Sequence, residues 1–243
     1  MNALTIKNLS KHFDGVRAVD DLSLSFEKGR VTALVGPNGS GKTTLMHLLS
    51  GVTPFDSGEV VVGTTAFSHI APYDISSLGI TRTFQSVQLF EQISVLDNIL
   101  VVLTERSVWA SLFERHSKFH TEKAKGVLEF VGLWEKRSEK VEGLSYGQRK
   151  LLEIARVLAM NCEIILFDEP FAGLFPEMVK RVRDAISHMR EAGKTIVFIE
   201  HSMQLIRELS DYVYVLDAGK LLAEGAPAHV LGERKVIAAY LGE

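Results

Sequence analysis

VTALVGPNGSGKTT, at residues 31–44, joins a short apolar run to a glycine-rich loop that ends in lysine and threonine. The loop fits the pattern G-x-x-x-x-G-K-[ST], and the apolar periodicity of residues 44–49 predicts a helix directly after it. Glycines let successive backbone N–H groups point into one concave surface, and the helix N-terminus adds partial positive charge. We therefore predict a binding site for nucleotide phosphates, formed by Gly36, Pro37, Asn38, Gly39, Ser40, Gly41, Lys42, Thr43 and Thr44.

Two side chains supply the specific chemistry of this loop. The Lys42 ammonium can reach the β- and γ-phosphates of a nucleotide, and the Thr43 hydroxyl can bind Mg²⁺. The alternative is a chance glycine turn, which the strand, loop and helix context disfavours.

A second apolar run, Ile164–Phe167, ends in two carboxylates, Asp168 and Glu169. Strands often end in solvated acids, so this pattern alone is weak. A phosphate loop, however, requires an acid at a neighbouring strand end to hold a metal ion. We predict that Asp168 holds Mg²⁺ through water and that Glu169 orients or deprotonates the attacking water.

The sequence Leu144-Ser145-Tyr146-Gly147-Gln148 precedes an amphipathic helical pattern that runs to residue 160. Ser145 is suited to the N-cap position, and the Gly147 backbone can approach a ligand closely. A helix N-terminus can bind an anion. On this segment alone, a capped amphipathic helix is the simpler interpretation.

Three stretches of the chain differ in their patterning. Residues 1–35 read as short strands joined by turns, residues 87–150 as mostly helical, and residues 163–216 as buried strands separated by helices. A hairpin is expected at residues 212–224. This order predicts a largely parallel α/β sheet with a helical insert.

Composition limits the classes of function. The chain has 243 residues, 46% of them hydrophobic, which is typical of a globular protein. A net charge of −3 argues against unspecific nucleic-acid binding, and the single cysteine, Cys162, excludes an internal disulfide framework. No apolar run approaches the roughly 18–20 residues of a membrane span, and no secretion signal is evident at the start. Any membrane role is therefore expected to come through a partner.

Taken together and in order, these motifs resemble the ATP-binding cassette family over essentially the whole chain. Residues 36–44 resemble its Walker A loop, residues 144–148 its signature motif, with Tyr146 where glycine is more usual, and residues 164–169 its Walker B motif. Three single residues also match the family: Gln85 its Q-loop glutamine, His201 its switch histidine and Phe13 its adenine-stacking aromatic. Taken alone, they would be interpreted as a surface amide, a structural histidine and a core aromatic.

The resemblance implies a set of cofactors and roles. ATP and Mg²⁺ would be the cofactors, and Glu169, His201 and Gln85 the catalytic residues. His201 would contact the γ-phosphate and hold Glu169 and the water, while Gln85 would sense the nucleotide. The metal ligands would be Thr43, Gln85 and Asp168. Phe13 and the Walker A residues would bind ATP held by this chain, and Ser145, Gly147 and Gln148 would cap ATP held by another.

The resemblance also implies an architecture and partners. It predicts a P-loop NTPase (RecA-like) core with an N-terminal antiparallel β subdomain, over residues 1–86 and 150–243, and an inserted α-helical subdomain at 87–149. A second ABC ATPase subunit, transmembrane permease subunits and, indirectly, a periplasmic or extracellular solute-binding protein would be the partners, with no nucleic acid. The chain would lie at the cytoplasmic face of the inner or plasma membrane.

One departure from the family pattern lies just after Walker B. Phe175 stands where the family usually has Asp or Asn, in the D-loop that crosses the dimer interface. We expect an apolar D-loop contact and asymmetric communication between the two ATP sites.

The branch within the family is open among transporters. Residues 79–85, 149–156, 172–174 and 239–243 resemble the ATP-binding subunit of branched-chain amino acid importers; urea-type importers share these motifs, and the lipopolysaccharide-export ATPase is also similar. A soluble, non-transport cassette ATPase is a further alternative, whereas a GTPase or small kinase would share only the phosphate loop. Apolar residues after Gln85 either receive a permease coupling helix or belong to the insert's core: Val87, Leu89, Phe90 and Ile93.

Overall fold

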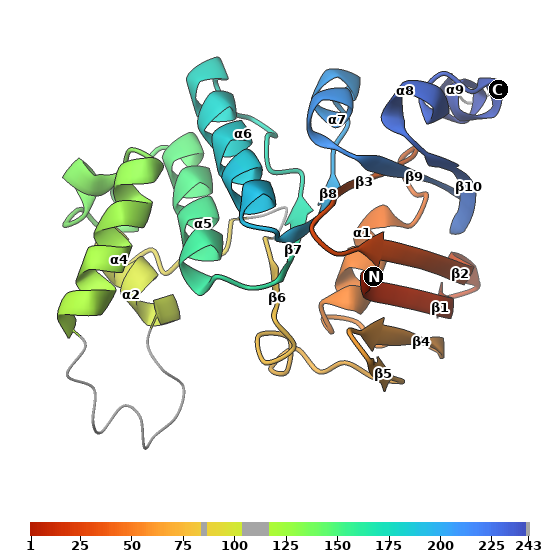
Figure 1. Ribbon diagram of the computed structural model, residues 1–243, viewed down its shortest axis with the longest axis horizontal. Helices are drawn as coiled ribbons and strands as arrows, with labels where there is room; N and C mark the ends of the chain where they lie inside the picture. Colours follow the sequence, from red (N-terminus) through yellow and green to blue (C-terminus); the bar gives the residue numbers. More distant parts are fainter. Residues whose placement is uncertain (84–86, 104–116, 242–243) are drawn as a thin grey trace. The chain divides into compact units, whose positions relative to one another are not determined.

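The computed structural model describes residues 1–83, 87–103 and 117–241, and Figure 1 shows their elements. Contacts divide the chain into two compact units. The first comprises residues 1–82, 162–170 and 186–243, and the second comprises residues 83–161 and 171–185. The predicted helical insert, 87–149, lies inside the second unit, which also includes the helix that follows the signature-like turn.

An antiparallel sheet of the first unit has the strand order β2-β1-β4-β5. Its strands are β1 (Asn2–Phe13), β2 (Val16–Glu27), β4 (Ser57–Val62) and β5 (Thr65–Phe67). Apolar residues that alternate along β1 and β2, such as Leu4, Ile6 and Phe26, are buried on one face, as period-two patterning requires. The predicted N-terminal antiparallel β subdomain is present, with strands longer than the patterning indicated.

The second sheet of this unit has the order β10-β9-β3-β8-β7-β6. Its strands are β3 (Val31–Val35), β6 (Ile80–Arg82), β7 (Ile164–Asp168), β8 (Thr195–Ile199), β9 (Tyr212–Asp217) and β10 (Lys220–Gly225). Every residue of β3, β7 and β8 is buried, which explains why these strands are continuous apolar runs rather than alternating ones. Five strands are parallel, and β10 pairs antiparallel with β9, which confirms the predicted hairpin.

The parallel pairing places three strand ends at one edge of the sheet. Leu34 of β3 and Asp168 of β7 both pair with Ile199 of β8, so the loops that follow these strands begin side by side. In open α/β sheets, this carboxyl edge is where ligands bind. The helices of this unit are α1 (Lys42–Leu49), α7 (Met203–Leu209), α8 (Pro227–Val230) and α9 (Arg234–Leu241), together with the end of α6.

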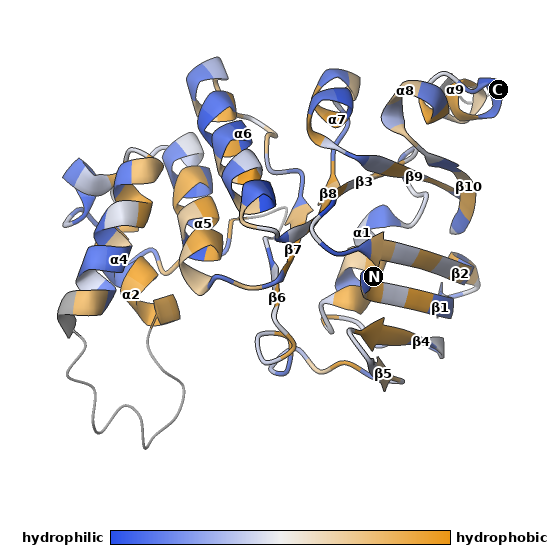
Figure 2. Cartoon of the chain, in the orientation of Figure 1, coloured by the Kyte–Doolittle hydropathy of each residue, from blue (hydrophilic) through white to orange (hydrophobic). Residues whose placement is uncertain are grey.

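The second unit is helical. It contains α2 (Val95–Leu103), α4 (Ser117–Phe130), α5 (Tyr146–Met160), most of α6 (Pro176–Glu191) and two short 3₁₀ turns, η1 (Trp134–Lys136) and η2 (Val141–Gly143). Helices α2, α4 and α5 pack against one another, and Figure 2 shows the apolar residues concentrated on α2 and α5. Their buried contacts include Ile99, Leu128 and Leu152.

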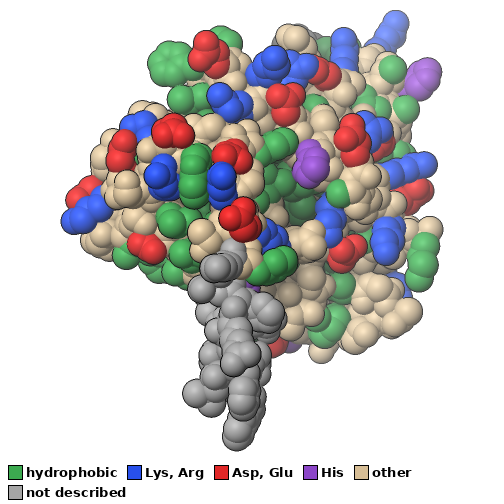
Figure 3. All heavy atoms as spheres, turned by 60° about the vertical axis from the view of Figure 1, so that its left-hand side comes forward, with side chains coloured by type: hydrophobic (Ala, Val, Ile, Leu, Met, Phe, Trp, Pro, Cys, Tyr) green, Lys and Arg blue, Asp and Glu red, His purple; other side chains and the backbone are tan. Residues whose placement is uncertain are grey.

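The surface is mixed in charge. On the face drawn in Figure 3, basic and acidic side chains are interspersed over the described residues. Among the residues that the structure describes, none of the helices combines the length and the apolar character needed to cross a membrane.

Candidate functional site

The phosphate loop leaves β3 at Gly36 and enters α1 at Lys42. Gly36 and Gly41 have φ of 147° and 98°, backbone conformations that favour glycine. A Cβ would lie 2.1 Å from the Leu216 carbonyl oxygen at Gly36, and 2.2 Å from the Ala18 carbonyl oxygen at Gly41. The close approach of neighbouring backbone therefore requires glycine at both positions, one at the start of the loop and one at its end.

Lys42 lies under this loop with only 6% of its surface exposed. Its Nζ donates to the carbonyls of Gly36 and Pro37, each at 2.9 Å, and to Ser40 Oγ at 3.3 Å. Burial lowers the pKa of Lys42, and the charges of Glu169 and Asp168 oppose that shift. The ammonium is thus already positioned inside the loop, where incoming phosphate oxygens can replace its carbonyl acceptors.

The remaining loop residues divide between the tip and the first helical turn. Asn38 and Gly39 are exposed at the tip, Ser40 is buried, and Thr43 and Thr44 are half-buried in the first turn of α1. Because Gly41 is the N-cap of α1 and supplies no side chain, the N-terminal N–H groups of this helix are not capped by that residue. This arrangement provides the backbone donors that an anion requires.

The predicted metal-holding acid, Asp168, ends β7 in a buried ion pair. Arg82, the last residue of β6, donates from Nη2 to Asp168 Oδ2 at 2.8 Å and from Nη1 to Ser50 Oγ at 2.8 Å. The side chains of Arg82 and Asp168 are 3% and 1% exposed. Arg82 lies within residues 79–85, which carry part of the family resemblance, but no role was predicted for it from the sequence.

Glu169 and His201 meet at the carboxyl edge of the sheet. His201 Nε2 lies 3.0 Å from Glu169 Oε1, with the two side chains 47% and 23% exposed. Glu169 has a φ of 49°, which is uncommon for a residue with a side chain and is typical of functional sites. Its N–H donates to the Ile199 carbonyl at 3.2 Å, which ties this strained residue to β8.

Glu200 is a further residue that the sequence analysis did not single out. Its carboxylate is buried and accepts the backbone N–H groups of His201, at 2.9 Å, and Ser202, at 3.2 Å. It therefore fixes the backbone that carries His201. In the sequence, the only sign of this role is the position of Glu200 between an apolar strand and His201.

Phe13, the predicted adenine platform, ends β1 beside the turn into β2. Its ring is 45% exposed, and Lys11 Nζ lies 5.3 Å from the ring centroid. The ring therefore presents a surface on which a planar base could stack. Gln85, predicted both as a catalytic residue and as a metal ligand, lies outside the described residues.

The signature-like turn in the second unit forms a capping box. Gln148 N–H donates to Ser145 Oγ at 3.4 Å, and Ser145 N–H donates to Gln148 Oε1 at 3.0 Å, which confirms the predicted N-cap. Gly147 is buried, and a Cβ there would lie 2.2 Å from Met178 Sδ. Packing against the first turn of α6 therefore explains the glycine at this position.

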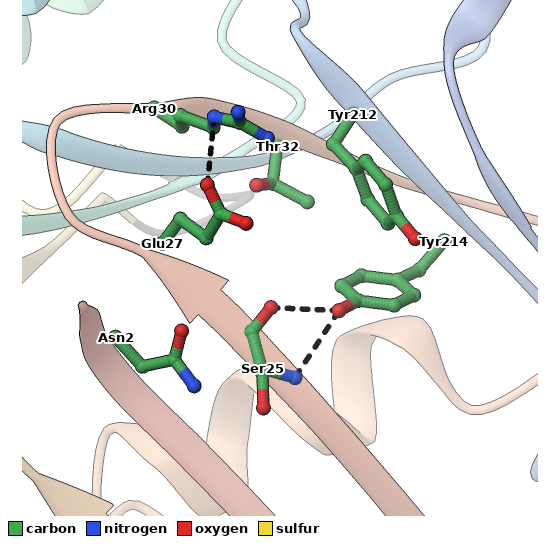
Figure 4. A pocket seen from close by; sticks show the side chains of 7 residues that line it. All are labelled: Asn2, Ser25, Glu27, Arg30, Thr32, Tyr212 and Tyr214. Atoms are coloured by element: carbon green, nitrogen blue, oxygen red, sulfur yellow. Dashed lines mark hydrogen bonds and ion pairs between the residues drawn. The ribbon is translucent and has the colours of Figure 1, made fainter.

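A cavity of about 210 Å³ lies elsewhere in the first unit. It is lined by Asn2, Ser25, Glu27, Arg30, Thr32, Tyr212 and Tyr214 (Figure 4). None of the described site residues lines it. Glu169 and His201 lie at the carboxyl edge of the sheet and not around this cavity.

Comparison with known proteins decides the family. The sequence profile described as ABC transporter matches residues 19–172, and a second, described as branched-chain amino acid ATP-binding cassette transporter, matches residues 220–243. The chain belongs to the ATP-binding cassette family. It is an ABC ATPase.

Relatives of this ABC ATPase match over its full length. A probable branched-chain amino acid transport ATP-binding protein of Archaeoglobus fulgidus is 35% identical, over 100% of this chain and 96% of that protein. The lipopolysaccharide export system ATP-binding protein of Escherichia coli is 33% identical, over 100% and 98%. A solved ATP-binding cassette of an ABC transporter, in its ADP conformation, is 34% identical with a TM-score of 0.86 and full coverage of both chains. The predicted P-loop NTPase fold is thereby confirmed.

The donor set of the ABC ATPase fits Mg²⁺ chemically. Thr43 offers a hydroxyl and Asp168 a carboxylate, and Mg²⁺ prefers such oxygen ligands. In nucleotide sites Mg²⁺ usually takes one or two ligands from the protein, and phosphates and water supply the remaining ligands. Among the described residues, no group of three or more His, Cys, Asp or Glu side chains could hold a metal ion. An ion shared with the nucleotide needs no such group.

Phe175 occupies the N-cap of α6 in this ABC ATPase. Its carbonyl accepts the Val179 N–H at 3.0 Å, and Pro176 follows at the first helical position, but the Phe175 side chain has no atom that can cap. The ring is 76% exposed. The apolar D-loop contact with a partner subunit stays a prediction.

Phe175→Asp is therefore expected to raise the free energy of unfolding by about 1 kcal/mol. The aspartate would accept an N–H of the first turn and would interact favourably with the helix dipole. Urea denaturation followed by circular dichroism measures the change. Phe175→Ala is the matched control, because it removes the same ring without adding a cap; an equal gain in both variants would contradict the capping explanation.

Proposed function

We propose that this ABC ATPase binds and hydrolyses ATP to power a membrane transporter that imports branched-chain amino acids or a related small polar solute, such as an amide or urea. The observation that carries this choice is the match of residues 220–243 to the branched-chain amino acid profile, because this segment lies outside the general ABC transporter profile. The 33% identity to the lipopolysaccharide export ATPase supports export as the second candidate.

The geometry of the first unit supports a division of labour at the ATP site. Lys42 and the loop N–H groups bind the phosphates, and Phe13 stacks on the adenine. Thr43 and Asp168 would hold Mg²⁺, which would neutralise phosphate charge when bound. Gln85, which lies outside the described residues, is the third ligand that we propose from the sequence. Glu169 accepts a proton from the attacking water, and His201, 3.0 Å from that carboxylate, holds it in position.

The proposed assembly completes this site with a second chain. Ser145, Gly147 and Gln148 would cap ATP held by the Walker A loop of another ABC ATPase subunit, identical or different. Transmembrane permease subunits would carry the solute, and a periplasmic or extracellular solute-binding protein would deliver it. The chain would then lie at the cytoplasmic face of the inner or plasma membrane.

An uptake experiment tests the choice between import and export. Deletion of the gene in the organism that encodes it is expected to lower uptake of labelled leucine, isoleucine and valine at least tenfold, and the wild-type gene should restore it. Urea and a short amide are assayed in parallel to define the solute class. Unchanged uptake together with loss of surface lipopolysaccharide would replace import with export.

Lys42→Ala is expected to fail to restore uptake and to weaken ATP binding at least tenfold in calorimetry. The variant loses charge-assisted hydrogen bonds to the phosphates, each worth about 1.5–3 kcal/mol. Lys194→Ala is the control, because Lys194 also lies in the first unit and pairs with Glu163 at 2.8 Å, at the opposite end of β8. Equal ATP affinity in wild type and Lys42→Ala would refute the assignment of the phosphate loop.

A further inference from the structure

The first residue of the phosphate loop is tied to the C-terminal helix. The buried Gly36 N–H donates to Tyr240 Oη at 2.8 Å. Tyr240 lies in α9, 204 positions further along the chain. It also lies in the segment matched by the branched-chain amino acid profile, outside the general ABC transporter profile.

This hydrogen bond acts on the same residue that holds Lys42. The peptide unit before Gly36 is bonded to Tyr240, and the peptide unit after it accepts Lys42 Nζ at 2.9 Å. Both peptides that flank Gly36 are therefore anchored, one to α9 and one to the phosphate-binding lysine. Loss of the first anchor would leave a buried N–H unsatisfied and free the start of the loop to take other conformations.

The surroundings of Tyr240 suit a fixed anchor. Val236, one turn earlier in α9, is only 2% exposed, and α9 packs against β10. Burial raises the pKa of Tyr240, so the phenol stays neutral at physiological pH. An uncharged, half-buried hydroxyl is a suitable permanent acceptor for a backbone N–H.

We propose that Tyr240 is a positioning residue for the nucleotide, and that helix α9 thereby sets the affinity of the phosphate loop for ATP and ADP. The inference rests on the proposed nucleotide site at this loop. A loop already held in its binding conformation loses less conformational freedom when phosphates bind, and this difference is seen in the dissociation constant. Displacement of α9 by a bound partner would weaken nucleotide binding through the same bond.

Tyr240→Phe tests the proposal, because it removes one hydroxyl and keeps the ring. Calorimetry with ATP and with ADP is expected to show dissociation constants raised 3- to 10-fold, the range that one net hydrogen bond accounts for. The hydrolysis rate at saturating ATP should change less than twofold, because Glu169 and His201 are untouched. A purely structural role would lower the unfolding midpoint without this change in affinity.

Tyr214→Phe is the matched control. Tyr214 is also in the first unit, and its hydroxyl accepts the Ser25 N–H at 3.1 Å and donates to the Ser25 carbonyl at 2.6 Å (Figure 4). The control loses a hydroxyl bonded to backbone but leaves the phosphate loop intact. It should lower stability and leave both dissociation constants unchanged; an equal rise in both variants would overturn the proposal.

Two further measurements keep the proposal falsifiable. If Tyr240→Phe does not fold, Val236→Ala is used instead, because it loosens the packing of α9. Faster hydrogen exchange in α9 together with weakened ATP affinity would support the inference. Faster hydrogen exchange with unchanged ATP affinity would overturn it. Lys42→Ala distinguishes a wrong role for Tyr240 from a wrong nucleotide site. If Lys42→Ala loses ATP binding and Tyr240→Phe does not, only the role of Tyr240 is wrong; if Lys42→Ala binds ATP normally, the proposed site itself is wrong.

Discussion

Glu169→Gln is expected to lower the rate of ATP hydrolysis by about 10²- to 10³-fold, a typical effect of removing a general base, while ATP binding persists. The amide keeps the size of the carboxylate and can still meet His201 Nε2, 3.0 Å from Oε1 in the wild type, but it cannot accept a proton from water. Steady-state phosphate release and calorimetry measure the two quantities separately. We also expect the variant to accumulate as an ATP-bound dimer, visible by size-exclusion chromatography.

Glu163→Gln is the matched control for this substitution. Glu163 precedes β7 at the end opposite to Glu169 and pairs with Lys194, so its loss should leave hydrolysis within twofold of wild type. Undiminished turnover in Glu169→Gln would exclude Glu169 as the general base. A loss of ATP binding in that variant would instead indicate that the carboxylate supports the nucleotide site before the chemical step.

Arg82→Met is expected to reduce the free energy of unfolding by about 3–5 kcal/mol, because it leaves the buried Asp168 carboxylate without its cation. Methionine approximates the length of the arginine stem, so lost volume contributes little. The pair is buried on both sides, with exposed fractions of 3% and 1%, and solvent therefore cannot screen the remaining charge. Urea denaturation monitored by circular dichroism measures the effect.

Two further variants show whether the lost stability of Arg82→Met comes from the buried ion pair. Arg30→Met breaks the exposed pair with Glu27, at 2.9 Å, and should cost less than about 1 kcal/mol. Arg82→Met combined with Asp168→Asn should recover part of the stability, since the buried group is then uncharged. If Arg82→Met costs no more than Arg30→Met, the buried pair is not a stabilising element of the site.

Local patterning predicted much of this molecule. The apolar runs at 31–35 and 164–167 became buried parallel strands, and the hairpin at β9 and β10 formed as expected. The N-cap at Ser145 was likewise predicted, since the contact of its side chain with the N–H three positions on is local. These features depend on residues that are near one another in the sequence.

The sequence by itself determined the phosphate loop, the buried strands that flank it and the acids that follow the second of them, because glycine spacing and hydrophobic periodicity report local backbone shape and burial. Only the tertiary structure decided that Arg82 neutralises Asp168 and that Tyr240 anchors Gly36. Those pairs are 86 and 204 positions apart. Periodicity states which residues are buried, but strand order and helix docking decide which buried polar groups meet, and each such group must find a partner there.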